Sequence, residues 1–316
     1  MNKRLVLVVV SAMLAMPLIA TSQVGPGERF ANWTPIIHLP APINSEFDDQ
    51  AAVLSGDELT IYFSSNRTGS INDSRDIWVS YRKTKRSGWQ TPVRLGLPIN
   101  SPGTELVRSI TPDGRTLLFQ SDRSGGSGQA DIWVTTRPTT NSDAHWSEPV
   151  NLGSEINTPF AELASNYLFT EGGRAQKLFY SSNKPGGFGG PDIYESTITD
   201  LGFASPVNVF ELNSPSIETC FWIREDGLEI IFSSNRPNLT EDRSFDDLWI
   251  SRRNSLYESW FTPVNLGSNI NTAGYQDVAP YVTSDGKTML MSSKRPGGWG
   301  PGTFDIYMST RSTAGW

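Results

Sequence analysis

The sequence is poor in the side chains from which most catalytic triads and metal centres are built. Its 316 residues include one cysteine, Cys220, and two histidines, His38 and His145. A single thiol cannot form an intramolecular disulfide, so the hydrophobic core must hold the fold together. With two histidines, the sequence excludes a histidine-rich metal site. It also offers few candidates for the histidine of a Ser-His-Asp triad. We predict no cofactor for this chain.

Beyond its N-terminus the sequence also lacks long apolar runs. Two basic residues precede an apolar stretch, Leu5–Ala20, which is followed by small residues before Gln23. This stretch is shorter than the ~18 residues that span a membrane comfortably, and the pattern is typical of a secretory signal. We therefore predict a signal peptide at residues 1–22, a mature domain at residues 23–316 without membrane insertion, and a periplasmic or secreted location.

Basic residues are outnumbered by acidic ones. The formal net charge is −7, and removal of the leader with its Lys3 and Arg4 would make it −9. An acidic surface disfavours nucleic acid and anionic lipid as partners. We predict neither.

Internal repetition is what the sequence has in abundance. A large aromatic residue recurs at steps of 56 or 57 residues, at Trp33, Trp89, Trp146, Phe203, Trp260 and Trp316. Three of the copies continue with Pro-Val-x-Leu-Gly after two intervening residues. A period of this length indicates one structural unit copied along the chain, and what all copies share is expected to be scaffold.

Each unit contains four strand-like segments and no helical periodicity. In the second unit, strands are expected at 105–110, at 116–121, at 131–137 and after Trp146. The first two are joined by Thr111-Pro-Asp-Gly, a tight turn in which proline presets one dihedral angle and glycine permits a positive one. A Gly/Ser-rich loop joins the second strand to the third. Four short antiparallel strands per unit predict the blades of a β-propeller.

Two motifs recur in all five units. The second strand ends in a Phe-Ser-Ser-Asn-Arg-like sequence at Phe63–Arg67, Phe119–Arg123, Phe179–Lys184, Phe232–Arg236 and Met291–Arg295. The third strand begins Asp-Ile/Leu-Trp/Tyr at Asp76, Asp131, Asp192, Asp247 and Asp305. These motifs resemble the WD-like propeller repeats of exported bacterial proteins, a group that includes the propeller domain of the Tol translocation protein. The resemblance covers about residues 33–316 and implies a propeller, but no particular activity.

The count of segments predicts five blades in one domain. Four complete blades fall at about 46–95, 105–152, 162–209 and 218–266. The fifth, 277–311, lacks its outer strand, which residues 33–39 can supply. Such closure leaves no open sheet edge where the chain ends meet, so we predict a monomer.

The longer connections are expected on one face of the propeller. The loops between second and third strands and those between blades fall on the same side, which we call the loop-rich face. The tight turns between first and second strands define the opposite turn face. Long loops on a rigid scaffold often carry binding residues. Two Gly-rich loops there contain aromatic residues, Phe188 and Trp299, which are candidates for ligand contact.

Charged residues are expected to form a ring on the loop-rich face. Acidic residues begin the inner strands at Asp49, Glu105, Glu162, Glu218 and Asp277, and basic residues end the second strands at Arg67, Arg123, Lys184, Arg236 and Arg295. In a structural interpretation each acid pairs with a base, which relieves repulsion between the carboxylates. In a functional one, two of Asp49, Glu105, Glu162 and Glu218 act as acid and base on a glycosidic bond. A third option is a Ca²⁺ ion held by the ring.

A few inner-strand residues differ between the blades. They are Arg108, Asn166, Phe221, Trp222 and Tyr281, where other blades hold small residues such as Ala52. An aromatic residue near the axis either stacks on a sugar or fills space between blades. We include Arg108 and Trp222, with Phe188, Trp299 and the five ring acids, among the predicted ligand-binding residues.

Together these patterns predict an exported binding module that recognises a glycan or an envelope protein on its loop-rich face. One alternative is a glycoside hydrolase, or a related carbohydrate-active enzyme, that uses carboxylates around the channel. Another is a structural or assembly propeller with a protein partner. Charge pairing separates the first two, since a general acid needs a carboxyl group in an apolar environment and not in an ion pair.

Overall fold

The computed structural model describes residues 33–140, 143–169, 174–237 and 245–312. The predicted signal peptide and Trp316 lie outside these ranges. The described chain forms 21 β-strands, β1–β21, and two short 3-10 turns, η1 (Ile71–Asp73) and η2 (Asp143–His145). No helix in these ranges has the length and apolar character needed to cross a bilayer.

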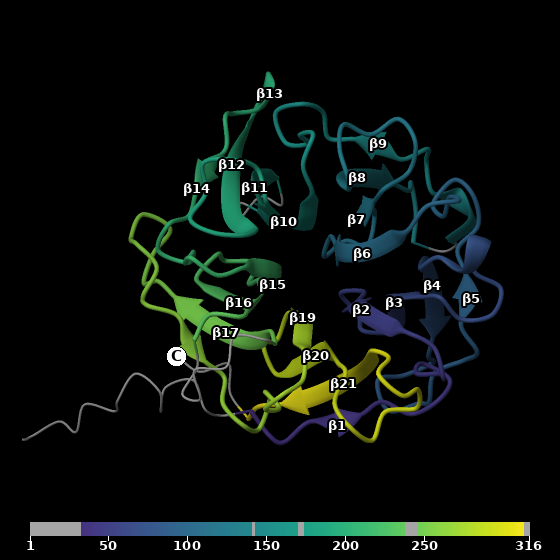
Figure 1. Cartoon of the computed structure of the whole chain (residues 1–316). Coiled ribbons are helices and arrows are strands. Elements are labelled where there is room, and N and C mark those ends of the chain that lie inside the picture. Colours follow the sequence, from purple (N-terminus) through teal and green to yellow (C-terminus); the bar gives the residue numbers. More distant parts are fainter. Residues whose placement is uncertain (1–32, 141–142, 170–173, 238–244, 313–316) are drawn as a thin grey trace, which may run out of the picture.

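The strands form five antiparallel sheets arranged around a central axis (Figure 1). Blade 1 contains β2 (Asp49–Leu54), β3 (Thr60–Ser65), β4 (Asp76–Tyr81) and β5 (Val93–Arg94). Blade 2 contains β6 (Glu105–Ile110), β7 (Thr116–Ser121), β8 (Asp131–Thr136) and β9 (Val150–Asn151). The innermost strands are β2, β6, β10, β15 and β19. This arrangement confirms the predicted five-bladed β-propeller.

The other blades follow the same order, with one elaboration. Blade 3 contains β10 (Glu162–Phe169), β11 (Ala175–Ser182), β12 (Asp192–Thr199), β14 (Val207–Asn208) and the additional β13 (Gly202–Phe203). Blade 4 contains β15 (Glu218–Ile223), β16 (Glu229–Ser234), β17 (Asp247–Arg252) and β18 (Val264–Asn265). Blade 5 contains β19 (Asp277–Val282), β20 (Thr288–Ser293), β21 (Asp305–Thr310) and β1 (Ile37–His38).

The ring closes as the sequence predicted. Strand β1 pairs antiparallel with β21, with Ile37 opposite Met308 and His38 opposite Tyr307. Figure 1 shows β1 along the outer edge of the blade formed by β19–β21. The N-terminal segment therefore supplies the fourth strand of the last blade.

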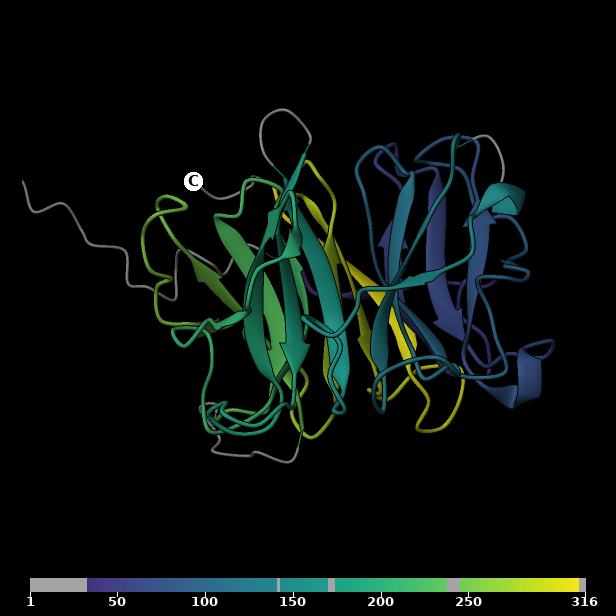
Figure 2. The same ribbon diagram turned by 90° about the horizontal axis from the view of Figure 1, so that it is seen from above.

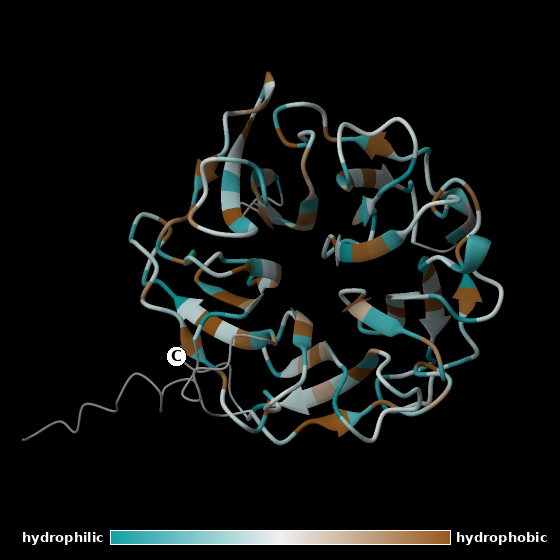
Figure 3. Ribbon diagram, viewed as in Figure 1, coloured by the Kyte–Doolittle hydropathy of each residue, from teal (hydrophilic) through white to brown (hydrophobic). Residues whose placement is uncertain are grey.

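Hydrophobic side chains pack between neighbouring blades. Tyr62 of blade 1 and Phe119 of blade 2 belong to one fully buried cluster, and Phe179 of blade 3 and Phe232 of blade 4 belong to another. Figure 3 shows apolar residues along the strands, while the connecting loops are largely hydrophilic. Since each blade buries both faces, the core is a series of layers around the axis.

The repeated tryptophans are packed against arginines that the sequence analysis did not single out. Trp33, Trp146 and Trp260 are buried. The guanidinium carbon lies over the tryptophan ring at 4.4 Å for Arg82–Trp89, 4.4 Å for Arg137–Trp146, 4.3 Å for Arg253–Trp260 and 4.5 Å for Arg311–Trp33. Each of these arginines also donates through Nε to a carbonyl of the turn between its first and second strands. The arginine thereby ties the outer segment to the inner turn of its blade.

The two faces of the ring are distinct. Figure 2 shows the strands running between an upper and a lower layer of connections, with η1 in the lower layer and η2 in the upper. Since η1 connects β3 to β4 and η2 connects β8 to β9, the lower layer is the loop-rich face and the upper layer is the turn face.

Candidate functional site

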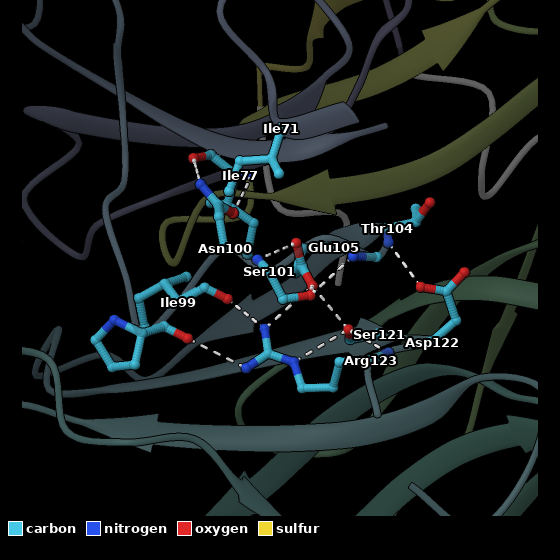
Figure 4. A network of polar contacts seen from close by, with 12 residues as sticks. Ile71, Ile77, Ile99, Asn100, Ser101, Thr104, Glu105, Ser121, Asp122 and Arg123 are labelled. Carbon is cyan, nitrogen blue, oxygen red and sulfur yellow. Dashed lines mark hydrogen bonds and ion pairs between the residues drawn. The ribbon is translucent and has the colours of Figure 1, made fainter. Parts of the chain in front are cut away.

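The five predicted ring acids are fully buried. Asp49, Glu105, Glu162, Glu218 and Asp277 each have 0% relative exposure. Figure 4 shows the network around Glu105, which accepts hydrogen bonds from the Ser101 backbone N–H at 3.0 Å, from Ser121 Oγ at 2.8 Å and from Arg123 Nη2 at 3.1 Å. Ser101 Oγ also donates to this carboxylate. Its donors therefore come from the preceding loop and from the second strand of the same blade.

Four of the five acids are paired with the arginine that ends the second strand. The pairs are Arg67–Asp49 at 2.6 Å, Arg123–Glu105 at 3.1 Å, Arg236–Glu218 at 2.9 Å and Arg295–Asp277. The same guanidinium donates to a backbone carbonyl of the blade-to-blade loop, as Arg123 does to Pro98 at 3.2 Å. It also lies over the aromatic rings of its own blade, with Arg123 Cζ 4.9 Å from the Phe119 centroid. This geometry matches the structural interpretation of these four acids.

Blade 3 departs from this pattern because it has a lysine in the arginine position. Lys184 Nζ donates to Tyr180 Oη at 2.9 Å and lies 4.1 Å from the centroid of the Tyr194 ring. Glu162 instead accepts from the Thr158 backbone N–H at 2.9 Å and from two hydroxyl groups, Thr158 Oγ1 and Ser182 Oγ, both at 2.7 Å. Burial raises the pKa of Glu162 above its ordinary value.

Burial determines what the ring can offer to a ligand. All five carboxylates are shielded from solvent, and each accepts hydrogen bonds from its own loop and strand. Within the described ranges, no group of three or more His, Cys, Asp or Glu side chains is placed to hold a metal ion. A ligand approaching the loop-rich face would therefore meet the loops before it met any ring acid.

The Gly-rich loops hold Phe188 and Trp299 in exposed positions. The backbone N–H of Phe188 donates to Asp192 Oδ2 at 2.6 Å, and that of Trp299 donates to Asp305 Oδ2 at 2.7 Å. Their side chains are 57% and 52% exposed. The residue before Phe188 must be glycine, because a Cβ on Gly187 would lie 2.3 Å from Asp192 Oδ2. The buried aspartates at the start of the third strands therefore fix the loops and present these two rings to solvent.

A pocket opens on the axis at the turn face, opposite the predicted binding face. Its walls include Ser109, Asn166, Tyr167, Phe169, Trp222 and Tyr281, from the inner strands of four blades, and its cavity volume is about 60 Å³. We call it the axial pocket. Three of the residues by which blades differ, Asn166, Trp222 and Tyr281, thus meet in one place. Phe221 and Arg108 lie one layer deeper in the channel.

Aromatic rings shape the axial pocket. Tyr167 and Phe169 meet edge to face, with ring centroids 6.2 Å apart. Burial raises the pKa of Tyr167 to about 12, so its hydroxyl stays protonated at neutral pH. Tyr281 Oη donates to the Leu54 carbonyl at 3.0 Å and so bridges blades 5 and 1. These contacts hold the pocket walls in place before any ligand arrives.

Polar side chains also line the axial pocket, namely Ser109, Thr111, Asn166, Arg224, Glu225 and Ser284. Ser109 is 7% exposed, and its Oγ is buried without a hydrogen-bond partner. Asn166 lies beside it on the next blade. Glu225 lines the pocket at the turn of blade 4, and burial together with the charge of Asp226 raises its pKa. The pocket therefore combines apolar surface with hydrogen-bonding and charged groups.

Several of these residues could not be selected from the sequence. Ser109 looks like any small inner-strand residue, and only its buried, unpartnered hydroxyl marks it. Tyr167 and Phe169 lie where β10 is extended to eight residues, whereas the other inner strands have six. In the sequence, the longer turn between the first and second strands of blade 3 was the feature that indicated this extension.

No protein-family model matches this chain, and no curated protein matches it. Solved structures do resemble it. An α-L-arabinofuranosidase from Podospora anserina in complex with cellotriose is 11% identical, with a TM-score of 0.54 over 90% of this chain and 98% of the other. A thermostable family-43 glycoside hydrolase is also 11% identical, with a TM-score of 0.52 over 85% and 90%. At such identities the likeness is one of fold.

A putative TolB from Agrobacterium tumefaciens is 13% identical, with a TM-score of 0.47 over 84% of each chain. A likeness of fold at these identities does not distinguish a binding protein from a hydrolase. The choice between binding and hydrolysis has to come from the side chains of this chain.

Proposed function

We propose that the protein is an exported carbohydrate-binding propeller that holds one end of a glycan in the axial pocket. One observation carries the proposal, namely that Asn166, Trp222 and Tyr281, which depart from the repeat, converge there with the buried Ser109 hydroxyl. The repeated residues build the blades, so residues that one blade has alone are free to serve a ligand. The site moves from the loop-rich face, where the sequence analysis placed it, to the turn face.

The chemistry of the pocket suits a sugar. A sugar ring has apolar C–H faces, which pack on aromatic side chains, and hydroxyl groups, which need donors and acceptors at its edge. Tyr167, Phe169 and Trp222 supply the aromatic surface for the C–H faces. Asn166 and Ser109 supply hydrogen-bonding groups for the hydroxyls. A cavity of about 60 Å³ holds about two water molecules' worth of volume. It therefore admits an edge or a hydroxymethyl group of a terminal sugar, and the rest of the glycan lies at the mouth.

The pocket has too few carboxylates for hydrolysis, and this favours a binding function. Glycosidic cleavage needs two carboxyl groups roughly 5–10 Å apart. Glu225 is the one carboxylate among the described residues that line the pocket, and the ring acids are fully buried in their hydrogen-bonded networks. A single acid can orient a hydroxyl group, but it cannot supply both the acid and the base.

Calorimetric titration of residues 23–316 with neutral and acidic oligosaccharides of the cell envelope tests this function. Ser109→Ala and Asn166→Ala each remove one hydrogen-bonding group at the pocket, and both should weaken binding by tenfold or more. Phe188→Ala and Trp299→Ala are the matched controls on the loop-rich face and should bind as the wild type does. The reverse pattern would return the site to the loop-rich face. If no saccharide binds to the wild-type protein, the proposed function is wrong.

A protein partner on the loop-rich face is a second candidate function. It is favoured by the exposure of Phe188 and Trp299 on loops fixed by buried aspartates, because aromatic side chains held in place lose little entropy on binding. Cross-linking from these two positions to an envelope protein would support this function, and the control variant Asn166→Ala, on the opposite face, should leave the cross-linking unchanged. Such a partner would not exclude a glycan in the axial pocket.

A further inference from the structure

Arg108 places an isolated cation inside the channel. Three residues beyond the ring acid, the other blades have Ala52, Ser165, Phe221 and Pro280. The space around Arg108 is lined by Ala51, Ala164, Ala279 and Cys220 from four other inner strands. The charge is therefore peculiar to blade 2 and lies among small side chains at the axis.

Among the described residues, the guanidinium has no counter-charge within ion-pair distance. Arg108 Nη2 donates to Gln120 Oε1, Nη1 lies 3.3 Å from Cys220 Sγ, and Nε is buried without a partner. Among the residues that the structure describes, no carboxylate lies within 4.0 Å of it, whereas Arg67, Arg123, Arg236 and Arg295 each have one. Sulfur is a weak acceptor, so among the described residues the partly buried guanidinium has no strong partner besides Gln120.

Gln120 holds Arg108 in place at the expense of a structural contact. At its position in blades 1, 4 and 5 a serine hydroxyl accepts from a backbone N–H of the following blade, as Ser64 does from Val107 at 2.9 Å and Ser233 from Ala279 at 3.3 Å. In blade 2 the side chain instead accepts from Arg108. The conformation of the arginine is thus supported where the repeat would use a scaffold residue.

The space beside Arg108 sets the size of its partner. The void has a volume of about 20 Å³, which is enough for one or two non-hydrogen atoms. The two cavities are lined by neighbouring positions of the inner strands, with Val53, Phe221 and Pro280 at the void and Leu54, Trp222 and Tyr281 at the axial pocket. A group that enters from the pocket must be small, planar or monoatomic, and negatively charged.

We propose that Arg108 is an anion site that receives the carboxylate of an acidic sugar seated in the axial pocket. This inference rests on the proposed function and adds the class of ligand, a glycan that ends in a uronic acid. A carboxylate has the charge that a guanidinium requires, and one of its oxygens, which fits the void, would accept a charge-assisted N–H···O bond. The net charge of −7 opposes a polyanion, so recognition is confined to the one charged unit that reaches Arg108.

The test compares a pair of oligosaccharides that differ only in the terminal unit, hexuronic acid against the corresponding neutral hexose. Titrations use residues 23–316 of the wild type, Arg108→Met, which keeps the aliphatic volume, and Arg108→Lys, which keeps the charge. The wild type should prefer the acidic glycan by tenfold or more, and high salt should reduce that preference. Arg108→Met should lose the preference and bind the neutral glycan as the wild type does. Arg108→Lys should keep part of it.

Other outcomes separate the two proposals. Equal affinity of the wild type for the two glycans would overturn the anion site and leave the carbohydrate function standing. A preference for the acidic glycan that survives in Arg108→Met would also overturn the anion site, because another residue would then bind the carboxylate. Acetate tests the carboxylate group alone, without a sugar. If acetate raises the melting temperature of the wild type but not that of Arg108→Met, the result would support the anion site. Failure of both glycans to bind would defeat the carbohydrate function.

Discussion

The guanidinium of Arg311 lies over the indole ring of Trp33, with its central carbon 4.5 Å from the ring centroid. This contact joins the end of β21 to the first described residue of the chain. Arg311 also forms a buried ion pair with Glu229 at 2.8 Å, and Arg252 pairs with the same carboxylate at 2.6 Å. The seam between the chain ends is therefore held by stacking and by the β1–β21 pairing, while the Arg311–Glu229 ion pair joins blade 5 to blade 4.

Deletion of residues 33–39 should prevent stable folding. The deletion removes β1, exposes the edge of β21 and leaves Arg311 without its aromatic partner. An unpaired edge is also a template for aggregation. We expect loss of the cooperative melt in circular dichroism and early elution from a sizing column. A truncated protein that melts like the full chain would show that closure contributes little.

Replacing one repeat tryptophan should be strongly destabilising. Trp146 is 6% exposed, lies under Arg137 and donates from Nε1 to Asp143 Oδ1 at 3.0 Å. Trp146→Ala should lower the free energy of unfolding by about 3–5 kcal/mol, as large-to-small core changes do. Trp299→Ala, at 52% exposure, should change it by less than about 0.5 kcal/mol. Urea denaturation of both variants gives the comparison, and similar losses would contradict the assignment of Trp146 to the core.

The repeat made most of the fold predictable from the sequence. The 57-residue step from Trp89 to Trp146 fixed the length of a blade, and the missing outer strand of the last unit pointed to residues 33–39. These inferences succeed because each blade is a local unit whose strands follow one another in sequence. The arginines that stack on the tryptophans were missed, although they recur six residues after the aspartate of the third-strand motif in four blades, at Arg82, Arg137, Arg253 and Arg311. The sequence pattern alone did not show that they pack against the tryptophans.

The candidate site was less predictable, for a geometric reason. Ser109, Trp222 and Tyr281 are more than 50 residues apart in sequence and meet only because three blades converge on the axis. The sequence identified Trp222 and Tyr281 as departures from the repeat, but it could not decide between packing and binding. It also could not tell how deeply the ring acids are buried, since that depends on where the blade-to-blade loops close over them.

The ring acids should differ in their contribution to stability. Glu218→Gln removes the charge opposite Arg236, whose side chain is 11% exposed, and the loss of one partner of a buried pair typically costs about 3–5 kcal/mol. Glu162→Gln should cost clearly less, because its donors are a backbone N–H and two hydroxyl groups and burial raises its pKa. Equal losses in urea denaturation would mean that charge pairing does not set the stability of the ring.

A loop glycine gives a sharper test of how the aromatic loops are fixed. Gly187→Ala would bring a methyl group to 2.3 Å from Asp192 Oδ2, so the carboxylate that holds the Phe188 N–H must move. We expect a loss of about 1–3 kcal/mol, as for other overpacked sites. Gly96→Ala is the control, since its Cβ would meet nothing within 4 Å. The two variants are compared by thermal melting, and an unchanged melt for Gly187→Ala would contradict the aspartate-centred loop.

Acidic pH should relieve an unfavourable charge at Asp246. This residue precedes β17 and is 8% exposed, and burial together with the charge of Asp247 raises its pKa from 3.8 to about 6. The folded protein therefore binds more protons than the unfolded chain between about pH 4 and pH 6, and stability attributable to this group falls as the pH rises through that window. At pH 7 the ionised carboxylate costs up to about 3 kcal/mol, since one pKa unit corresponds to about 1.4 kcal/mol.

Asp246→Asn removes this charge while keeping the shape of the side chain. The variant should be more stable than the wild type at pH 7, and the difference should shrink as the pH falls towards 4. Glu105, Glu162 and Asp277, whose pKa values burial also raises, contribute equally to both proteins and cancel in the comparison. The measurement is the free energy of unfolding of each protein in urea at several pH values. A difference that stays constant with pH would mean that Asp246 does not titrate in this range.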